Sequence, residues 1–314
     1  MNIELKIQES FFGQAIGDAL GVPVEFKSRK HLTENPVKDF LGFMCWNQPP
    51  GTFSDDSSMM FCTAESLSKK YDIEDIGNLF VKWYKEGFWG AHDELFDIGG
   101  TTRRSLDRII EGEKAKFSGE FFPENNGNGS LMRILPLVFL LYSETNINIR
   151  FQIVKEVSSI THAHFRSIMS CFIYVEFGIQ ILKGKDKKKA YLDAQIIINN
   201  FIDNNDFNPD EIQLFEKVLK NRIEKYDIDE INSNGYVIDS IESSLWCFMN
   251  SNSYAESVLM SVNLGGDTDT TAAINGGIAG LYYGWGNIPK KWVDNIAKKN
   301  EIINLSKKFA ESIK

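Results

Sequence analysis

The chain has few cysteines, no long apolar run and no excess of basic residues, and each shortage argues against a class of protein. Its four cysteines are widely spaced without a Cys-x-x-Cys pair, which argues against a disulfide framework and a zinc-thiolate site. We interpret Cys45, Cys62, Cys171 and Cys247 as reduced core thiols. Acidic residues outnumber basic ones by 43 to 34, and the net charge of −9 disfavours general nucleic-acid binding.

Features that would direct the chain to a membrane are also missing. Residues 1–6 include an acid and lack the apolar core of a secretory signal. The longest apolar run, residues 272–286, is too short and too rich in glycine to span a bilayer. We therefore expect a cytoplasmic protein without a membrane partner.

Alternating strand patterns are almost absent, whereas helical periodicity recurs along the whole chain. No internal repeat or linker interrupts it, and the 43% hydrophobic fraction is enough for a substantial core. The sequence predicts a single, compact, all-α, multi-helix domain over residues 1–314. We expect residues 22–26 to leave the first helix in extended form. Helical patterns are clearest over residues 6–20, 54–67, 76–84, 168–182, 236–249, 254–262 and 300–313.

The most informative stretch places two acids directly after a pair of glycines. Asp267 and Asp269 follow Gly265 and Gly266 and precede an apolar helical pattern. Residues two apart on a regular helix do not face each other, so the acids converge only if the glycine turn bends the chain. The ligands here are all hard oxygens, which suit Mg²⁺, Mn²⁺ or Ca²⁺ and not zinc. The alternative is an ordinary helix start with Asp or Thr as its cap.

A second stretch, residues 51–57, has the same build. A glycine and hydroxyl residues precede Asp55 and Asp56, and a helical apolar pattern follows. Two acid-bearing helix starts that are distant in the sequence could meet in space and form one oxygen cage.

Two further acids have apolar neighbours, where a carboxylate needs a partner. Glu25 lies between Val24 and Phe26, and Asp97 lies between Phe96 and Ile98. The alternatives are a surface glutamate at position 25 and an aspartate at position 97 that caps the following helix.

Residues 125–133 form a loop of asparagines and glycines, expected to lead into a helix. Open backbone N–H groups at a helix start can hold phosphate. Arg133 would pair either with that phosphate or with a structural carboxylate. His162 and His164 precede a long helical pattern, and we expect hydrogen-bonded histidines at a helix start instead of zinc ligands.

Together these segments resemble the ADP-ribosylglycohydrolase family, which includes the dinitrogen-reductase-activating glycohydrolase. The similarity covers most of the chain in the family order, but not residues 185–235, where we find no functional signal. The matching segments are residues 13–21 with Glu25, 51–56, 97–99, 127–133, 161–162 and 265–270.

The resemblance implies an all-helical fold with a central dinuclear metal cleft, two divalent cations (Mg²⁺ or Mn²⁺) and cleavage of ADP-ribose from a protein. The family usually has threonine where this chain has Ser54, and serine retains the oxygen. The implied metal ligands are Ser54, Asp55, Asp56, Asp267, Asp269 and Thr270. The implied substrate-binding residues are Gly99, Gly100, Gly127, Asn128, Gly129, Ser130, Met132 and His162. The implied catalytic residues are Asp97 and Glu25, with Glu25 beside the metals as a ligand or holding a water.

Physical chemistry agrees with this assignment, because five carboxylates in one site repel each other. Two like charges about 4 Å apart repel by roughly 4 kcal/mol at an effective dielectric near 20, so cations explain the acids. Asp97 in its apolar loop can accept a guanidinium, so we expect cleavage of the N-glycosidic bond to arginine. Two alternatives stay open, namely hydrolysis of serine-linked or other O-linked ADP-ribose, and a non-catalytic relative resembling a crystallin or occupying a partner's cleft.

Overall fold

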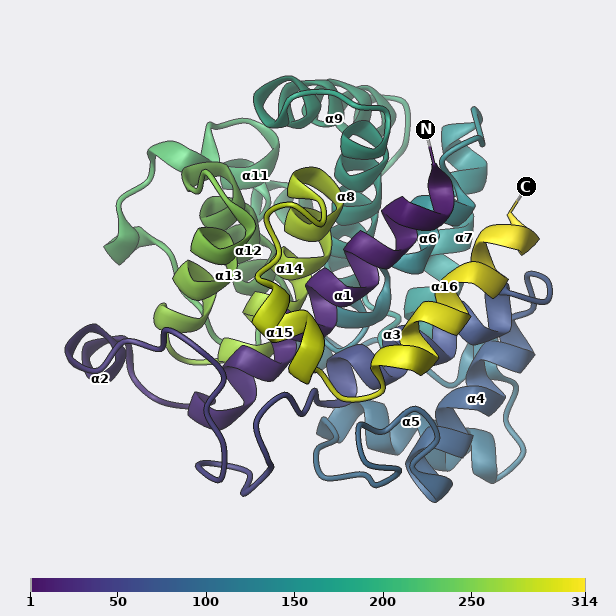
Figure 1. Ribbon diagram of the computed structural model, residues 1–314. Coiled ribbons are helices and arrows are strands. Elements are labelled where there is room, and N and C mark those ends of the chain that lie inside the picture. Colours follow the sequence, from purple (N-terminus) through teal and green to yellow (C-terminus); the bar gives the residue numbers. More distant parts are fainter. Residues whose placement is uncertain (1, 314) are drawn as a thin grey trace.

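The computed structural model describes residues 2–313, and over this range the chain is helical, with two isolated β-bridges and no sheet (Figure 1). The prediction of an all-α fold is therefore confirmed. The α-helices are α1 (Ile3–Gly21), α2 (Arg29–Glu34), α3 (Asp55–Leu67), α4 (Ile73–Glu86), α5 (Gly100–Ile110), α6 (Pro136–Leu140), α7 (Ile147–Ser159), α8 (Phe165–Leu182), α9 (Lys187–Asp203), α10 (Pro209–Gln213), α11 (Glu216–Leu219), α12 (Val237–Asn250), α13 (Tyr254–Asn263), α14 (Thr268–Tyr283), α15 (Lys290–Asn295) and α16 (Lys299–Ser312). The 3₁₀ turns are η1 (Val22–Val24), η2 (Ala115–Phe117), η3 (Pro123–Asn125), η4 (Leu131–Arg133), η5 (Ile223–Lys225) and η6 (Ile228–Glu230).

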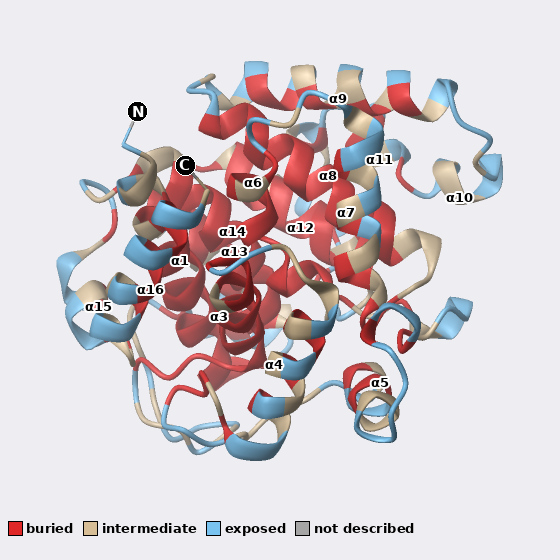
Figure 2. Ribbon diagram, turned by 90° about the vertical axis from the view of Figure 1, so that its right-hand side faces the viewer, coloured by how far each residue is buried: buried red, intermediate tan, exposed pale blue. Residues whose placement is uncertain are grey.

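Helices α1 and α14 pack against each other at the centre of the molecule, and Figure 2 shows both among the buried elements. Glycines four residues apart on α1 lie on one face and permit a close approach. A Cβ atom on Gly17 would lie 2.1 Å from the carbonyl oxygen of Ala272, and one on Gly21 would lie 2.4 Å from the Cα of Asp269. The small residues of α1 therefore bring its C-terminal end against the acid-bearing start of α14.

Among residues 2–313, α8 is the one helix whose length and apolar composition alone would allow it to cross a membrane. Residues Phe165–Leu182 have a mean hydropathy of 1.3, but 89% of them are buried within the protein. Helix α8 packs against α7, α9 and α12, so its apolar surface forms part of the core. This helix, and not residues 272–286, is the strongest hydrophobic segment of the fold.

Two local expectations were wrong. Residues Val22–Val24 form a 3₁₀ turn with Pro23 in its first positions, and the chain turns again at Glu25 and Phe26, where Phe26 has a φ of +64°. The fixed φ of proline is compatible with such a turn as well as with extended chain, so periodicity alone did not separate them. All four cysteines are free thiols, but Cys45 is exposed and is not a core residue.

Candidate functional site

The glycine pair before α14 places Asp267 beside the Glu25 segment. Gly265 and Gly266 have φ values of +76° and +77°, in the left-handed region that favours glycine. The Phe26 amide donates to the Gly266 carbonyl at 2.8 Å, and the Gly266 amide donates to the Lys27 carbonyl at 2.8 Å. This backbone pairing holds the turn that contains Glu25 against the start of α14.

Asp18 on α1 determines where α3 begins. Its Oδ1 accepts a hydrogen bond from the Ser54 amide at 2.9 Å. Its Oδ2 accepts from the amide and the hydroxyl of Ser57 at 3.0 and 2.6 Å. Ser54 is the N-cap, and Asp55 and Asp56 occupy the first turn, so Asp18 positions both acids.

Asp18 is a site residue to which the sequence motifs gave no role. The available signal was a carboxylate inside an otherwise apolar helical stripe, because a charge buried there needs strong partners.

The acids form two groups of three that could each hold a metal ion. One contains Asp18, Asp56 and Asp269, and the other contains Glu25, Asp267 and Asp269, with one oxygen of each residue within 4.8 Å of the others. Asp18, Glu25, Asp56 and Asp269 are buried, Asp267 is half-buried, and Asp269 belongs to both groups. Among residues 2–313, Oδ1 of Asp56 and Oδ1 of Asp267 are buried without a hydrogen-bond donor. Carboxylate oxygens held in this way fit a hard divalent cation.

Burial raises the pKa values of four of these carboxyl groups, those of Asp18, Glu25, Asp56 and Asp269. It raises the pKa of Asp18 to about 7 against its hydrogen bonds from Ser57 and Ser54. It raises the pKa of Glu25 to about 8, which the Trp46 hydrogen bond opposes and the charge of Asp97 reinforces. Without cations, the folded protein therefore retains protons here that an unfolded chain releases near pH 4.

This difference predicts how the stability of the metal-free protein depends on pH. A carboxyl whose folded pKa is raised stabilises the fold below its unfolded pKa, and that stability is lost as the pH rises through the folded value. The melting temperature of chelator-treated protein should therefore fall between pH 5 and pH 8. Added Mg²⁺ should raise it more at pH 8 than at pH 5, because protons compete for the carboxylates. Differential scanning calorimetry tests this, and a melting temperature that rises over this range without a Mg²⁺ effect would contradict it.

A cavity of about 270 Å³ opens onto the second acid group. Three larger clefts, of about 690, 400 and 370 Å³, lie beside α7, beside residues 229–234 and beside α16, but none of them is lined by a residue of the two acid groups. Of the residues assigned from the sequence, Ser54, Asp56, Asp269 and Ser130 do not line the 270 Å³ cavity. Its lining comprises Glu25, Phe26, Asp55, Asp97, Gly99, Gly100, Thr101, Thr102, Gly127, Asn128, Gly129, Met132, His162, Gly235, Asp267 and Thr270.

The glycine loop of the cavity lies against His162. A Cβ atom on Gly129 would lie 2.8 Å from Cε1 of His162 and 3.0 Å from Oγ1 of Thr102. The Nδ1 atom of His162 is 2.7 Å from the Thr161 hydroxyl. Burial lowers the pKa of His162 to about 3, so its ring is neutral at physiological pH. The structure thus leaves Nε2, on the cavity side, for a ligand.

A valine at position 129 should weaken the binding of free ADP-ribose by about tenfold or more, because its side chain would displace the His162 ring from the cavity. Gly286→Val is a matched control, since a Cβ there would meet nothing within 4 Å. Isothermal titration calorimetry with ADP-ribose measures both variants. Equal affinities for Gly129→Val and the wild type would remove this loop from the binding site.

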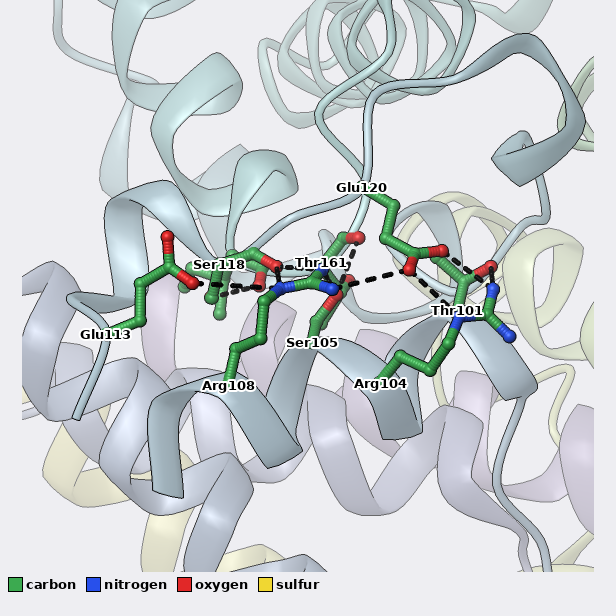
Figure 3. Close-up of polar contacts among 9 residues, drawn as sticks. Thr101, Arg104, Ser105, Arg108, Glu113, Ser118, Glu120 and Thr161 are labelled. Atoms are coloured by element: carbon green, nitrogen blue, oxygen red, sulfur yellow. Dashed lines mark hydrogen bonds and ion pairs between the residues drawn. The ribbon is translucent and has the colours of Figure 1, made fainter. Parts of the chain in front are cut away.

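A network of salt bridges and hydrogen bonds holds α5 against the segment around Thr161, the residue before His162 (Figure 3). Arg104 donates to the Glu120 carboxylate at 2.9 and 2.7 Å, and Arg108 donates to it at 3.4 Å. The backbone of Glu120 pairs with the segment around Thr161, and the Ser105 hydroxyl donates to the Thr161 carbonyl at 3.1 Å. Two walls of the cavity are therefore held together through Glu120.

Several polar residues of the 125–133 loop act differently from the expectation. Arg133 is fully buried and donates to the Gly129 and Val157 carbonyls and to the Thr161 hydroxyl, so it pairs with neither a phosphate nor a carboxylate. The loop also does not lead directly into an α-helix, because residues Leu131–Arg133 form a short 3₁₀ turn. Backbone carbonyls as arginine partners cannot be read from the sequence.

The side chains of Asn128 and Ser130 make structural hydrogen bonds to other residues of the protein. The Asn128 amide donates to Oδ2 of Asp267 at 2.7 Å and so orients that carboxylate. The Ser130 hydroxyl is buried and accepts from the Ser158 hydroxyl at 2.9 Å, so its side chain points away from the cavity. His164 is the N-cap of α8, as expected for a hydrogen-bonded histidine at a helix start.

Asp97 faces the cavity and does not cap α5. The N-cap of α5 is Gly99, without a side-chain capping bond, so the capping alternative was wrong. Burial raises the pKa of Asp97, and the charge of Asp267 adds to this rise. A positively charged partner next to this half-buried carboxylate would stabilise its ionised form.

Comparisons with known proteins agree with this geometry. A model of the ADP-ribosylglycohydrolase family matches residues 1–314. The ADP-ribosylarginine hydrolase Tri1 of Serratia proteamaculans is 32% identical over 309 residues, which cover 97% of this chain and 78% of that relative. The dinitrogen reductase-directed ADP-ribosyl glycohydrolase of Rhodospirillum rubrum is 25% identical, covering 93% of this chain and 90% of the relative. A solved ADP-ribosylglycohydrolase-related protein complex contains a chain that matches with a TM-score of 0.82, at 26% identity and over 99% of both chains.

Proposed function

Because the chain belongs to the ADP-ribosylglycohydrolase family, we propose that it hydrolyses the N-glycosidic bond between ADP-ribose and arginine in modified proteins, using two divalent cations, Mg²⁺ or Mn²⁺. The observation that carries this proposal is the pair of buried carboxylate groups that share Asp269 next to a cavity lined by Asp97. So many mutually repelling buried acids lower the stability of the fold, so a purely structural role does not explain them.

The residues divide the work by position. Asp56, Asp267, Asp269 and Glu25 would hold the cations, with Ser54, Asp55 and Thr270 as neighbouring oxygen donors. When bound, the cations supply electrostatic stabilisation of the ribose oxygens and of the charge that develops as the bond breaks.

The chain's own groups position and protonate the substrate. The glycine loop of residues 127–129 and Nε2 of His162 would hold the diphosphate and the riboses. Glu25 joins the second acid group to the cavity, so it is placed to hold the attacking water or to take its proton. Asp97 would hold the guanidinium, because guanidine leaves readily only in its protonated form.

Two observations favour arginine over serine as the linkage. Asp97 is a cavity-lining carboxylate without a capping role, and a serine ether would need no such counter-charge. The Serratia relative is named for ADP-ribosylarginine hydrolysis, at 32% identity.

The test supplies purified protein and Mg²⁺ with matched arginine-, serine- and DNA-linked ADP-ribose substrates and measures the ADP-ribose released. We expect the fastest release from arginine. Faster release from serine would overturn the linkage, and binding of ADP-ribose without release from any substrate would favour a non-catalytic relative.

A further inference from the structure

Four large apolar side chains stay exposed on two segments beside the cavity. They are Phe26, Leu41, Phe43 and Met44, which we call the apolar rim. The Phe26 residue is 73% exposed and Phe43 is 66% exposed, and Phe26 also lines the cavity. Exposed apolar groups next to a binding site are typical of an interaction surface.

Two rim residues also have unfavourable backbone conformations. Phe26 has a φ of +64° and Phe43 has a φ of +57°. Bulky residues rarely adopt this left-handed region, because the side chain then crowds the following carbonyl oxygen at a cost in free energy. Neither ring offsets that cost by burial within its own chain, so both would gain burial only under a partner.

The rim is tied to the two acids proposed for catalysis. The Cys45 amide donates to the Pro23 carbonyl at 3.2 Å, and the Cys45 thiol donates to the Glu25 carbonyl at 3.1 Å. The Trp46 indole donates to the Glu25 carboxylate, and its ring packs 5.8 Å from the ring of Phe96, the neighbour of Asp97. The segment that bears Phe43 and Met44 therefore contacts the segments that carry both acids.

We propose that the apolar rim binds the polypeptide that flanks the modified arginine, with an apolar side chain of the substrate covering the exposed rings. This inference rests on the proposed function, in which Asp97 and Glu25 face the bond that is cleaved. In that proposal, the ADP-ribose on one side of the scissile bond occupies the glycine-rich cavity. The group on its other side is the protein chain, which must leave the cavity past these two acids, where the rim begins.

The test uses three arginine-ADP-ribosylated substrates: a short peptide with leucines beside the arginine, the same peptide with serines, and free ADP-ribosylarginine. The variant is Phe43→Asn combined with Met44→Gln. Asparagine tolerates the left-handed backbone, so the change removes the ring without adding strain. Phe117→Asn is the control, because Phe117 is 64% exposed on η2 but lies outside the rim and the cavity.

We expect the double variant to lose about tenfold in kcat/KM for the leucine peptide, mainly through KM, and to stay within about twofold of the wild type on free ADP-ribosylarginine. The serine peptide should be a poorer substrate than the leucine peptide only for the wild type and the Phe117→Asn control. Equal effects on all three substrates, or no effect, would overturn the docking surface while leaving the hydrolase proposal intact. A wild type inert on all three would overturn the proposed function and the docking surface with it. If the double variant instead separates a dimer into monomers with unchanged substrate ratios, the rim is a contact between copies of this chain.

Discussion

Replacing Asp269 by asparagine should abolish hydrolysis and at the same time stabilise the metal-free protein. Asp269 is the residue that both acid groups share, so its loss removes an oxygen ligand from each proposed cation site. We expect turnover to fall by about a thousandfold or more, because the charge stabilisation of the cleavage step is lost. Asparagine retains the Oδ1 atom that accepts the Thr270 amide at 2.9 Å, so the start of α14 should persist.

The stability effect distinguishes this account from simple damage to the fold. Burial and the charges of Glu25 and Asp56 raise the pKa of Asp269, which shows that its ionised form is disfavoured in the metal-free protein. Removing that charge should raise the melting temperature of chelator-treated protein by roughly 2 °C or more and remove its stabilisation by Mg²⁺. Asp193→Asn is the control, since Asp193 on α9 pairs with Lys185 and Lys189 and belongs to neither acid group. A variant that loses activity because it melts early, or that retains full Mg²⁺ stabilisation, would contradict the shared-ligand role.

Replacing Asp97 by asparagine should slow arginine-linked hydrolysis selectively. Asparagine keeps the size of the side chain but can neither neutralise a guanidinium nor exchange a proton with it. We expect kcat on arginine-linked substrate to fall by about a hundredfold to ten-thousandfold, the range of general acid–base catalysis. Affinity for free ADP-ribose should change little, because that ligand has no guanidinium.

The matched substrates separate leaving-group chemistry from a general defect. Any release from serine-linked ADP-ribose should be much less sensitive to Asp97→Asn than release from arginine. Since the N-cap of α5 is Gly99, the thermal stability should also stay close to that of the wild type. Unchanged arginine-linked turnover, or equal losses on both linkages, would remove Asp97 from the leaving-group role.

The helix starts were readable from the sequence because their signals are local. The sequence predicts a glycine turn at residues 265–266 and a helix start at Asp55 and Asp56, and the structure has both, with positive φ at the two glycines and Ser54 as the N-cap. The meeting of Glu25 with Asp267 depends on a backbone pairing between Phe26 and Gly266, which no local pattern encodes.

Residues whose roles depend on tertiary contacts were harder to assign. Asp18 became visible as a site residue only through the close packing of α1 on α14 and its bonds to the start of α3. Arg133 and Ser130 have polar side chains next to a binding loop, yet both are directed into the interior. Sequence spacing places them near the cavity, but only packing decides which way their side chains point.

We propose above that the buried carboxylates make the protein a cation-dependent hydrolase of arginine-linked ADP-ribose. The most direct measurement is the release of ADP-ribose from an arginine-ADP-ribosylated protein by chelator-treated enzyme, before and after Mg²⁺ or Mn²⁺ is restored. We expect no release before the cation is added and full recovery after it. Full turnover by the chelator-treated protein, with no cation binding detected by calorimetry, would contradict it.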